Sequence, residues 1–291
     1  MENILGGIVI AFILVAALWE LFTGRTTEGR KTKQDWWMAF LAAVMMIVIQ
    51  RPLLTVSVAL IMALLLPGSA GALVYLQEDY FWWTLLGFFC IEEFLHGSSH
   101  YFSHAKRPKN KTLQWIQAFY KMNHRPHHLS GGQDNKGQIS VTQTFVNGWA
   151  WWLILPNYWF QIITLYLGLT DVFLVGTAFK GLWAAHTHVN WNYDLYFHNH
   201  KWKWVRTLMW CAAHIITFPT QHHQHHSRGK NSMHNLTATL AIYDWLIFKT
   251  LAIETSKPKI YGWRQNDEEA NSAVIRISFF IVNISSYLVL F

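Results

Sequence analysis

The residues of this chain best suited to chemistry are its histidines, which are clustered. His222, His225 and His226 form an H-x-x-H-H group, and positions i, i+3 and i+4 share one face of a helix. Three imidazoles would therefore point in one direction. The other clusters are His124, His127 and His128 in the same pattern, His96, His100 and His104 at four-residue spacing, and the pair His186 and His188.

Neutral imidazole is the commonest metal ligand in proteins, and packing alone gives no reason to gather so many. About nine imidazoles exceed the four ligands of one tetrahedral ion, so they indicate two ions, each with four or five nitrogens. The motifs contain no carboxylate or thiolate, and this ligand type permits zinc, copper, iron or nickel. The candidate ligands are His100, His104, His124, His127, His128, His186 or His188, His222, His225 and His226.

The composition is typical of a membrane protein. Of the 291 residues, 52% are hydrophobic and only 13% charged, about half the usual ~25%. The 17 Trp and 11 Tyr residues favour bilayer interfaces. The formal charge of +7 comes from basic residues in loops beside apolar segments, which fits anionic lipid headgroups or membrane topology better than nucleic acid. Cys90 and Cys211 form no CxxC pair, so they indicate neither thiolate ligands nor disulfides.

Apolar segments predict an all-α fold, an integral membrane helical bundle with a cytosolic helical cap that carries the dimetal site. Residues 4–22 are long enough to cross the ~30 Å hydrocarbon core and lack a signal-peptide cleavage pattern, so we expect a retained anchor. We divide the chain into an N-terminal transmembrane anchor region (1–78), a catalytic domain with a transmembrane hairpin (79–262) and a C-terminal apolar or interfacial helix (263–291). The apolar segments in the catalytic domain are 80–95, 149–167 and 172–185, with an amphipathic stretch at 236–251.

Residues 36–66 are too long for one straight span, and Pro52 should push Arg51 away from helical angles. This segment is either a kinked span or a span followed by an interfacial piece. Basic residues are concentrated in loops, and the positive-inside rule puts such loops in the cytosol. One kinked crossing places every basic loop and every histidine cluster on the cytosolic face, so we favour it over a hairpin.

Several polar residues near the clusters have other expected roles. His96 is either an outer ligand or only a neighbour, and His223 should point away from the metal and support a ligand. Glu93 and Asp244 are expected to support the ligands or the fold instead of binding metal. The remaining histidines, which we expect to be ordinary interface residues, are His198, His200, His214 and His234.

From Glu93 to Thr250 the sequence resembles the fatty acid hydroxylase/sterol desaturase superfamily of membrane di-iron enzymes. Glu93 stands seven residues before His100, where the family's first motif has an acid, and Tyr101 replaces the expected Arg. His186 and His188-Val-Asn190 each resemble the family's single-histidine motif. The other matching segments are His124-Arg-Pro-His127-His128, Pro219 to His226, and the closing Asn235-Leu-Thr and Tyr243 to Thr250, from which the family's glycines are absent.

The resemblance implies a membrane-bound di-iron oxygenase that uses O2 and external electrons to hydroxylate a lipid alkyl chain or a sterol-like substrate. It implies two iron ions bound by the candidate histidines and a separate electron-transfer protein, cytochrome b5-like or ferredoxin-like. An all-imidazole site also accepts zinc, so purified protein can carry zinc instead of iron.

Three alternatives are open. A lipid or sterol desaturase or a carotenoid hydroxylase shares the same motifs, and only its product would distinguish it. A histidine-rich membrane metal transporter would place ionisable residues at membrane depth, whereas these histidines lie at or beyond the ends of apolar segments. A non-catalytic lipid-binding relative would be expected to have lost some ligand positions, but every one of them is histidine.

Overall fold

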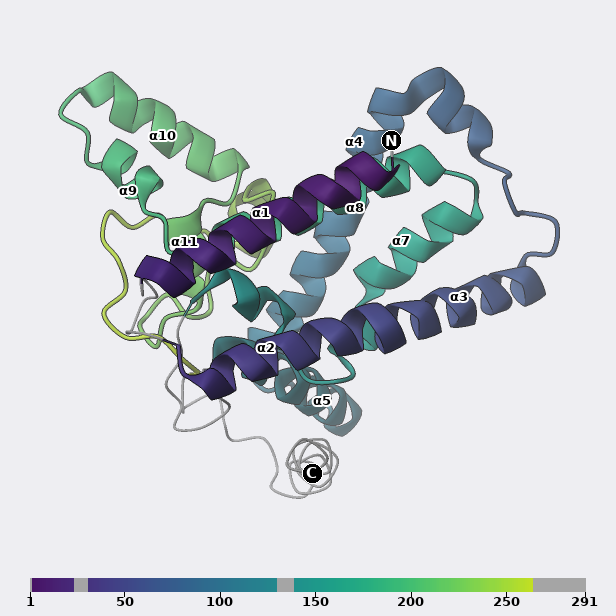
Figure 1. Cartoon of the computed structure of the whole chain (residues 1–291), viewed down its shortest axis with the longest axis horizontal. Helices are drawn as coiled ribbons and strands as arrows, with labels where there is room; N and C mark the ends of the chain where they lie inside the picture. The colour runs from purple at the N-terminus through teal and green to yellow at the C-terminus, as the bar shows by residue number, and fades with distance from the viewer. Residues whose placement is uncertain (1, 24–30, 130–138, 264–291) are drawn as a thin grey trace.

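The computed structural model describes residues 2–23, 31–129 and 139–263 (Figure 1). Their regular structure is helical, and apart from one isolated bridge between Ser227 and Tyr261 the described ranges contain no β-structure. The predicted all-α fold is confirmed for this part of the chain. The C-terminal helix predicted for residues 263–291 lies outside the described residues except for Trp263.

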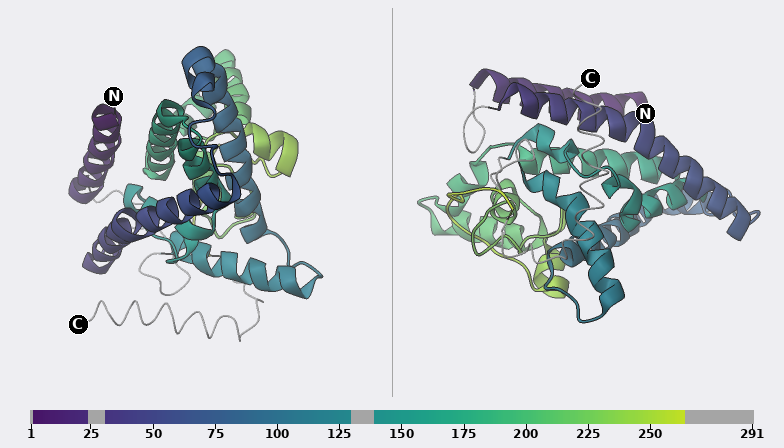
Figure 2. Two further views of the ribbon diagram at one scale, coloured as in Figure 1. Left: turned by 90° about the vertical axis from the view of Figure 1, so that its right-hand side faces the viewer. Right: turned by 90° about the horizontal axis from the view of Figure 1, so that it is seen from below.

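Two N-terminal helices are long and apolar enough to cross a membrane. The first is α1 (Glu2–Thr23). The second joins α2 (Lys33–Met45) to α3 (Arg51–Leu65) through a π-helical turn at Met46–Gln50. Both lie along one side of the molecule (Figure 2, right) and leave most of their apolar side chains exposed. A bilayer would cover such side chains.

The Arg51-Pro52 step does not interrupt the second helix. Arg51 keeps right-handed helical angles (φ −65°, ψ −48°), and its N–H donates to the carbonyl of Met46. The expectation that Pro52 would force Arg51 out of the helix is wrong, because the wider π turn accommodates the proline ring. Residues 33–65 form one continuous helical run, as the single-crossing interpretation requires.

The core beside the site is formed by α4 (Val74–His104), α7 (Pro156–Tyr166) and α8 (Thr170–His188). Leu85 and Phe88 of α4 pack against Val172 of α8. A Cβ atom at Gly176 would overlap the Phe88 ring, so glycine allows α4 and α8 to approach closely. Since α4 begins at Val74, the predicted domain boundary at 78/79 falls inside one helix, next to a kink at Tyr80.

A charged cluster lies buried between these helices. Lys180 of α8 forms ion pairs with Glu92 (2.7 Å) and Glu93 of α4. Glu92 also accepts from the side-chain amides of Asn157 (2.9 Å) and Gln161 (3.1 Å) of α7. The cluster thus ties α4 to both α7 and α8 and fixes the helix that carries the first histidines.

The other elements surround the histidines. Gln143 and Val141 lie in a short 3₁₀ helix, Val141–Phe145. The predicted amphipathic stretch 236–251 is mostly irregular, with one π-helical turn at Asp244–Phe248. The remaining helices are α5 (Lys111–His128), α6 (Trp151–Ile154), α9 (Tyr193–His198), α10 (Lys203–Ile215) and α11 (Pro219–His225), of which α9 to α11 gather at one end of the molecule (Figure 1).

Candidate metal centre

Four helices bring histidines together in the interior. The H-x-x-H-H groups fall at the ends of α5 and α11, and the four-residue spacing in α4 keeps His100 and His104 on one face. α8 contributes its last residue, His188. All nine converging histidines are buried: His100, His104, His124, His127, His128, His188, His222, His225 and His226.

The nine rings divide into a group of five and a group of four. The five-histidine group consists of His100, His104, His124, His128 and His225, and the four-histidine group consists of His127, His188, His222 and His226. Within each group, one nitrogen of every ring lies within 4.8 Å of the corresponding nitrogens of the others. Each group could therefore hold a metal ion.

The closest approaches are between Nε2 atoms. In the five-histidine group, Nε2 of His124 lies 2.8 Å from that of His100 and 2.9 Å from that of His128. In the four-histidine group, the corresponding distances are 3.1 Å for His127–His188, 3.0 Å for His188–His222 and 3.1 Å for His222–His226.

The two groups are in contact. The rings of His128 and His226, one from each group, lie with their centroids 4.4 Å apart and nearly parallel. Within the H-x-x-H-H motif of α11, His225 belongs to one group and His222 and His226 belong to the other. Each such motif therefore contributes to both groups, which places the two candidate ion sites side by side.

Backbone carbonyls fix the orientation of four of these rings. A carbonyl oxygen only accepts, so each bonded Nδ1 carries the proton and each Nε2 presents a lone pair. The bonds run from Nδ1 of His100 to Leu236 (2.6 Å), His127 to Gln143 (3.0 Å), His188 to Ala184 (2.6 Å) and His225 to His234 (3.2 Å).

The contact between His127 and His188 favours a cation beside their two Nε2 atoms. Both rings use their proton on a carbonyl, so two lone pairs face each other at 3.1 Å. Two neutral rings in this arrangement repel unless a cation lies beside both nitrogens. A metal ion bound by both nitrogens would remove this repulsion.

In the part of the chain that the structure describes, five further nitrogens of the nine rings are buried without a hydrogen-bond partner. They are Nε2 of His104 and His225 and Nδ1 of His124, His222 and His226, and Nδ1 of His225 is bonded to a carbonyl. A buried polar atom without a partner is costly, and a metal ion bound at the two Nε2 atoms would remove that cost there. The nine imidazoles therefore fit a metal pair, and their donor type is open to iron, zinc, copper and nickel.

Burial keeps the rings neutral and ready to bind. It lowers the pKa of His127 from 6.5 to about 4 and holds the pKa of His188 well below its usual value. Neighbouring imidazoles lower it further for His188 and His222. Because metal ions bind the neutral ring, no proton has to be displaced from these sites at pH 7.

Asp244 acts on the centre through the backbone. Its carboxylate accepts from the N–H groups of Leu236 (2.8 Å) and Thr237 (3.0 Å) and from the Thr250 hydroxyl (2.6 Å). These bonds fix the segment whose Leu236 carbonyl orients His100. Asp244 thus has a supporting role, as predicted from its sequence position, although it contacts no ligand ring.

Glu93 also supports the fold without touching a ligand ring. It accepts from the N–H of Thr239 (2.8 Å) and pairs with Lys180. It therefore holds α4 against the segment that contains Leu236.

Two tryptophans form walls of the centre. The Trp151 ring stacks on His124 with centroids 4.6 Å apart, and the Trp263 ring lies 5.1 Å from both His104 and His128. Both side chains are buried. They cover the five-histidine group with apolar surface and limit the entry of water.

His186 is the candidate ligand that the structure does not bring to either group. Residues i and i+2 of an α-helix point about 200° apart around its axis, so His186 and His188 face in opposite directions. Nε2 of His186 lies 2.7 Å from the Tyr193 hydroxyl instead. The choice that the sequence left open between these two histidines is therefore resolved geometrically towards His188.

The other histidines also lie outside the two groups. His96 packs edge-on against His100 with centroids 5.5 Å apart, as a neighbour. His223 is buried and separate from the ligand rings. Of the expected interface residues, His234 contributes its backbone carbonyl to His225, and His198, His200 and His214 lie away from the centre.

Sequence reasoning missed the aromatic walls and the carbonyls that accept from the histidine rings. Ala184 could have been found, because it lies one helical turn before His188. Gln143, Leu236 and Trp263 carry no such signal, since they are separated from their histidines by loops.

Comparison with protein-family models, curated proteins and solved structures yields no significant match to this chain.

Proposed function

We propose that the protein is a membrane-bound di-iron oxygenase, of the kind found in the fatty acid hydroxylase/sterol desaturase superfamily, that hydroxylates a lipid alkyl chain or a sterol-like ring. The observation that carries this proposal is the pair of adjoining groups of five and four buried histidines. Two iron ions bound there would supply the activation of O2 that insertion into a C–H bond requires. The overall reaction would be RH + O2 + 2 e⁻ + 2 H⁺ → ROH + H2O.

The protein's part is to hold the ions, keep the ligands neutral and exclude water. Backbone carbonyls accept from Nδ1 of His100, His127 and His188, which leaves each Nε2 available to bind an ion. Trp151 and Trp263 cover rings of the five-histidine group. A water-poor site protects reactive species from side reactions.

The exposed apolar faces of α1 and the α2–α3 helix favour a membrane location. In this proposal α4, α7 and α8 also enter the bilayer as a multi-pass bundle and the histidine centre lies on the cytosolic face. A lipid substrate would then reach the centre from the membrane. The electrons would come from a separate cytochrome b5-like or ferredoxin-like protein.

The test is oxygen incorporation from 18O2 in cells that produce the protein. Lipid extracts should contain a product heavier by one 18O atom, and this product should be absent from cells with the His225→Ala/His226→Ala variant. Cells with a His214→Ala variant, which changes a histidine of α10 outside the centre, should still contain the product. A product lighter by two hydrogens would show desaturation, and no lipid change in iron-replete cells would contradict an oxygenase.

A further inference from the structure

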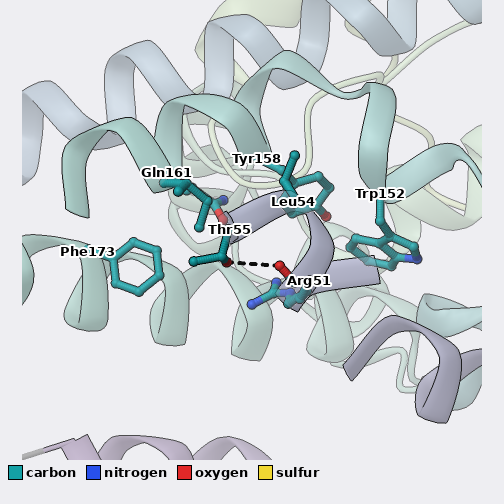
Figure 3. A pocket seen from close by; sticks show the side chains of 8 residues that line it. Arg51, Leu54, Thr55, Trp152, Tyr158, Gln161 and Phe173 are labelled. Carbon is teal, nitrogen blue, oxygen red and sulfur yellow. Dashed lines mark hydrogen bonds between the residues drawn. The ribbon is translucent and has the colours of Figure 1, made fainter. Parts of the chain in front are cut away.

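A small cavity lies between α3, α7 and α8 (Figure 3), and no histidine lines it. Its volume is about 130 Å³. Arg51 and Thr55 of α3 line it together with Tyr158 and Gln161 of α7. Trp152 and Phe173 provide apolar wall. The cavity thus combines one cation with mostly apolar surroundings.

Arg51 is a charged residue near the middle of a helical run of 33 mostly apolar residues. An arginine in such a segment is costly and usually faces a partner or a functional site. The Arg51 guanidinium carbon lies 5.7 Å from the centroid of the Tyr158 ring. Among the residues that the structure describes, no carboxylate lies within ion-pair distance of this guanidinium.

The neighbouring polar groups do not supply the missing anion. The Thr55 hydroxyl donates to the backbone carbonyl of Arg51 (2.9 Å). The Gln161 amide donates to Glu92 (3.1 Å), whose other oxygen pairs with Lys180. The contacts of Glu92 go to Lys180, Asn157 and Gln161, so among the described residues Arg51 has no direct counter-ion.

The size and chemistry of the cavity define that partner. A dry cavity of about 150 Å³ holds one benzene molecule, so about 130 Å³ accommodates a head group with its first carbons but not a whole lipid. Guanidinium forms paired hydrogen bonds with carboxylate or phosphate. The Trp152 and Phe173 walls suit the adjoining methylene groups.

We propose that this cavity binds the oxyanion head group, a carboxylate or a phosphate, of a single-chain membrane amphipath, with Arg51 as its counter-ion. The site is separate from the histidine centre, so the proposal stands or falls independently of the oxygenase reaction. It assigns a lipid-binding function to the π turn and proline step that place Arg51 in the α2–α3 helix.

The experiment measures ligand binding to the purified full-length chain in a neutral detergent by native mass spectrometry. The probes are oleate, oleyl phosphate, oleyl alcohol and inorganic phosphate. Three variants are compared. Arg51→Gln removes the charge, Arg51→Lys keeps the charge but loses the paired N–H groups of guanidinium, and Phe173→Trp fills the cavity. Lys203→Gln removes an exposed charge from α10 as the matched control.

Wild-type protein should bind one oleate or one oleyl phosphate at least about tenfold more tightly than oleyl alcohol. Arg51→Gln and Phe173→Trp should each weaken binding of the charged ligand by about tenfold. Arg51→Lys should weaken it by less, and Lys203→Gln should not change it. The tighter of the two charged ligands identifies the head group.

Equal binding of oleate and oleyl alcohol by the wild-type protein would overturn the proposal, even if Arg51→Gln failed to fold. Unchanged oleate binding by folded Arg51→Gln would also overturn it. Equally tight binding of inorganic phosphate would show a site for free anions and overturn the assignment to an amphipath.

Discussion

The Nε2 atoms of His127 and His188 face each other at 3.1 Å while the Nδ1 atom of each ring is bonded to a backbone carbonyl. This arrangement leaves two lone pairs in contact inside the protein. A cation bound by both nitrogens would make it favourable, which supports His188 as a candidate ligand in the four-histidine group. His186, two residues earlier, faces Tyr193.

Replacing His188 by alanine should therefore remove roughly one metal ion per chain, because three ligands remain in its group. Replacing His186 by alanine should leave the metal content unchanged. Metal analysis of the two purified variants measures the difference. The opposite result, loss in His186→Ala and none in His188→Ala, would contradict the ligand assignment.

Asp244→Asn should weaken metal binding although Asp244 touches no ligand ring. The change weakens the hydrogen bonds that hold Leu236, whose carbonyl orients His100. Loss of such a supporting bond typically costs about 10–100-fold in metal affinity. Competition with a chelator measures this affinity, and Asp79→Asn, at an exposed acid of α4, is the control. Equal metal affinity in both variants would show that the position of the Leu236 carbonyl does not depend on Asp244.

Lys180→Met should destabilise the protein strongly, because it leaves Glu92 and Glu93 buried without their cation. Breaking a buried ion pair from one side costs about 3–5 kcal/mol. Thermal unfolding in detergent should show a large fall in the midpoint. The double variant Lys180→Met/Glu93→Gln should unfold at a higher temperature than Lys180→Met alone. A midpoint within a degree or two of the wild type would show that the cluster contributes little.

The metal-free protein should lose stability as the pH falls from about 6.5 to about 4. Burial lowers the pKa of His127 to about 4, so between these values the unfolded chain binds a proton that the folded chain does not. At about 1.36 kcal/mol per pKa unit, this one residue accounts for up to about 3 kcal/mol. Chelator-treated protein should unfold at lower temperature at pH 4.5 than at pH 7, and His127→Gln should reduce the difference. A midpoint that rises on acidification would contradict burial of neutral rings.

Much of the centre was predictable because helical spacing translates directly into geometry. The i, i+3, i+4 pattern of His222, His225 and His226 places three rings on one helix, and the same holds for α5. What spacing does not contain is the relation between helices. It could not show that each motif contributes to both groups, nor that His188 at the end of α8 faces inward. Both features depend on how α4, α5, α8 and α11 pack together.

The expectations for irregular segments were the weakest. Pro52 was expected to push Arg51 away from helical angles, but a π turn accommodates the proline, since local widening costs less than exposing backbone in an apolar segment. The stretch 236–251 has helical periodicity, but the Asp244 carboxylate bonds to Leu236 and Thr237 and closes a loop instead. Long-range hydrogen bonds override local propensity at such positions.

The most direct test of the two-ion centre is the metal content per chain of protein purified in mild detergent after growth with iron. The same measurement is made on the His225→Ala/His226→Ala variant, which removes one ligand from each group. We expect close to two iron atoms per chain in the unaltered protein and a sharp fall in the variant. One metal ion or none in the unaltered protein would contradict the account.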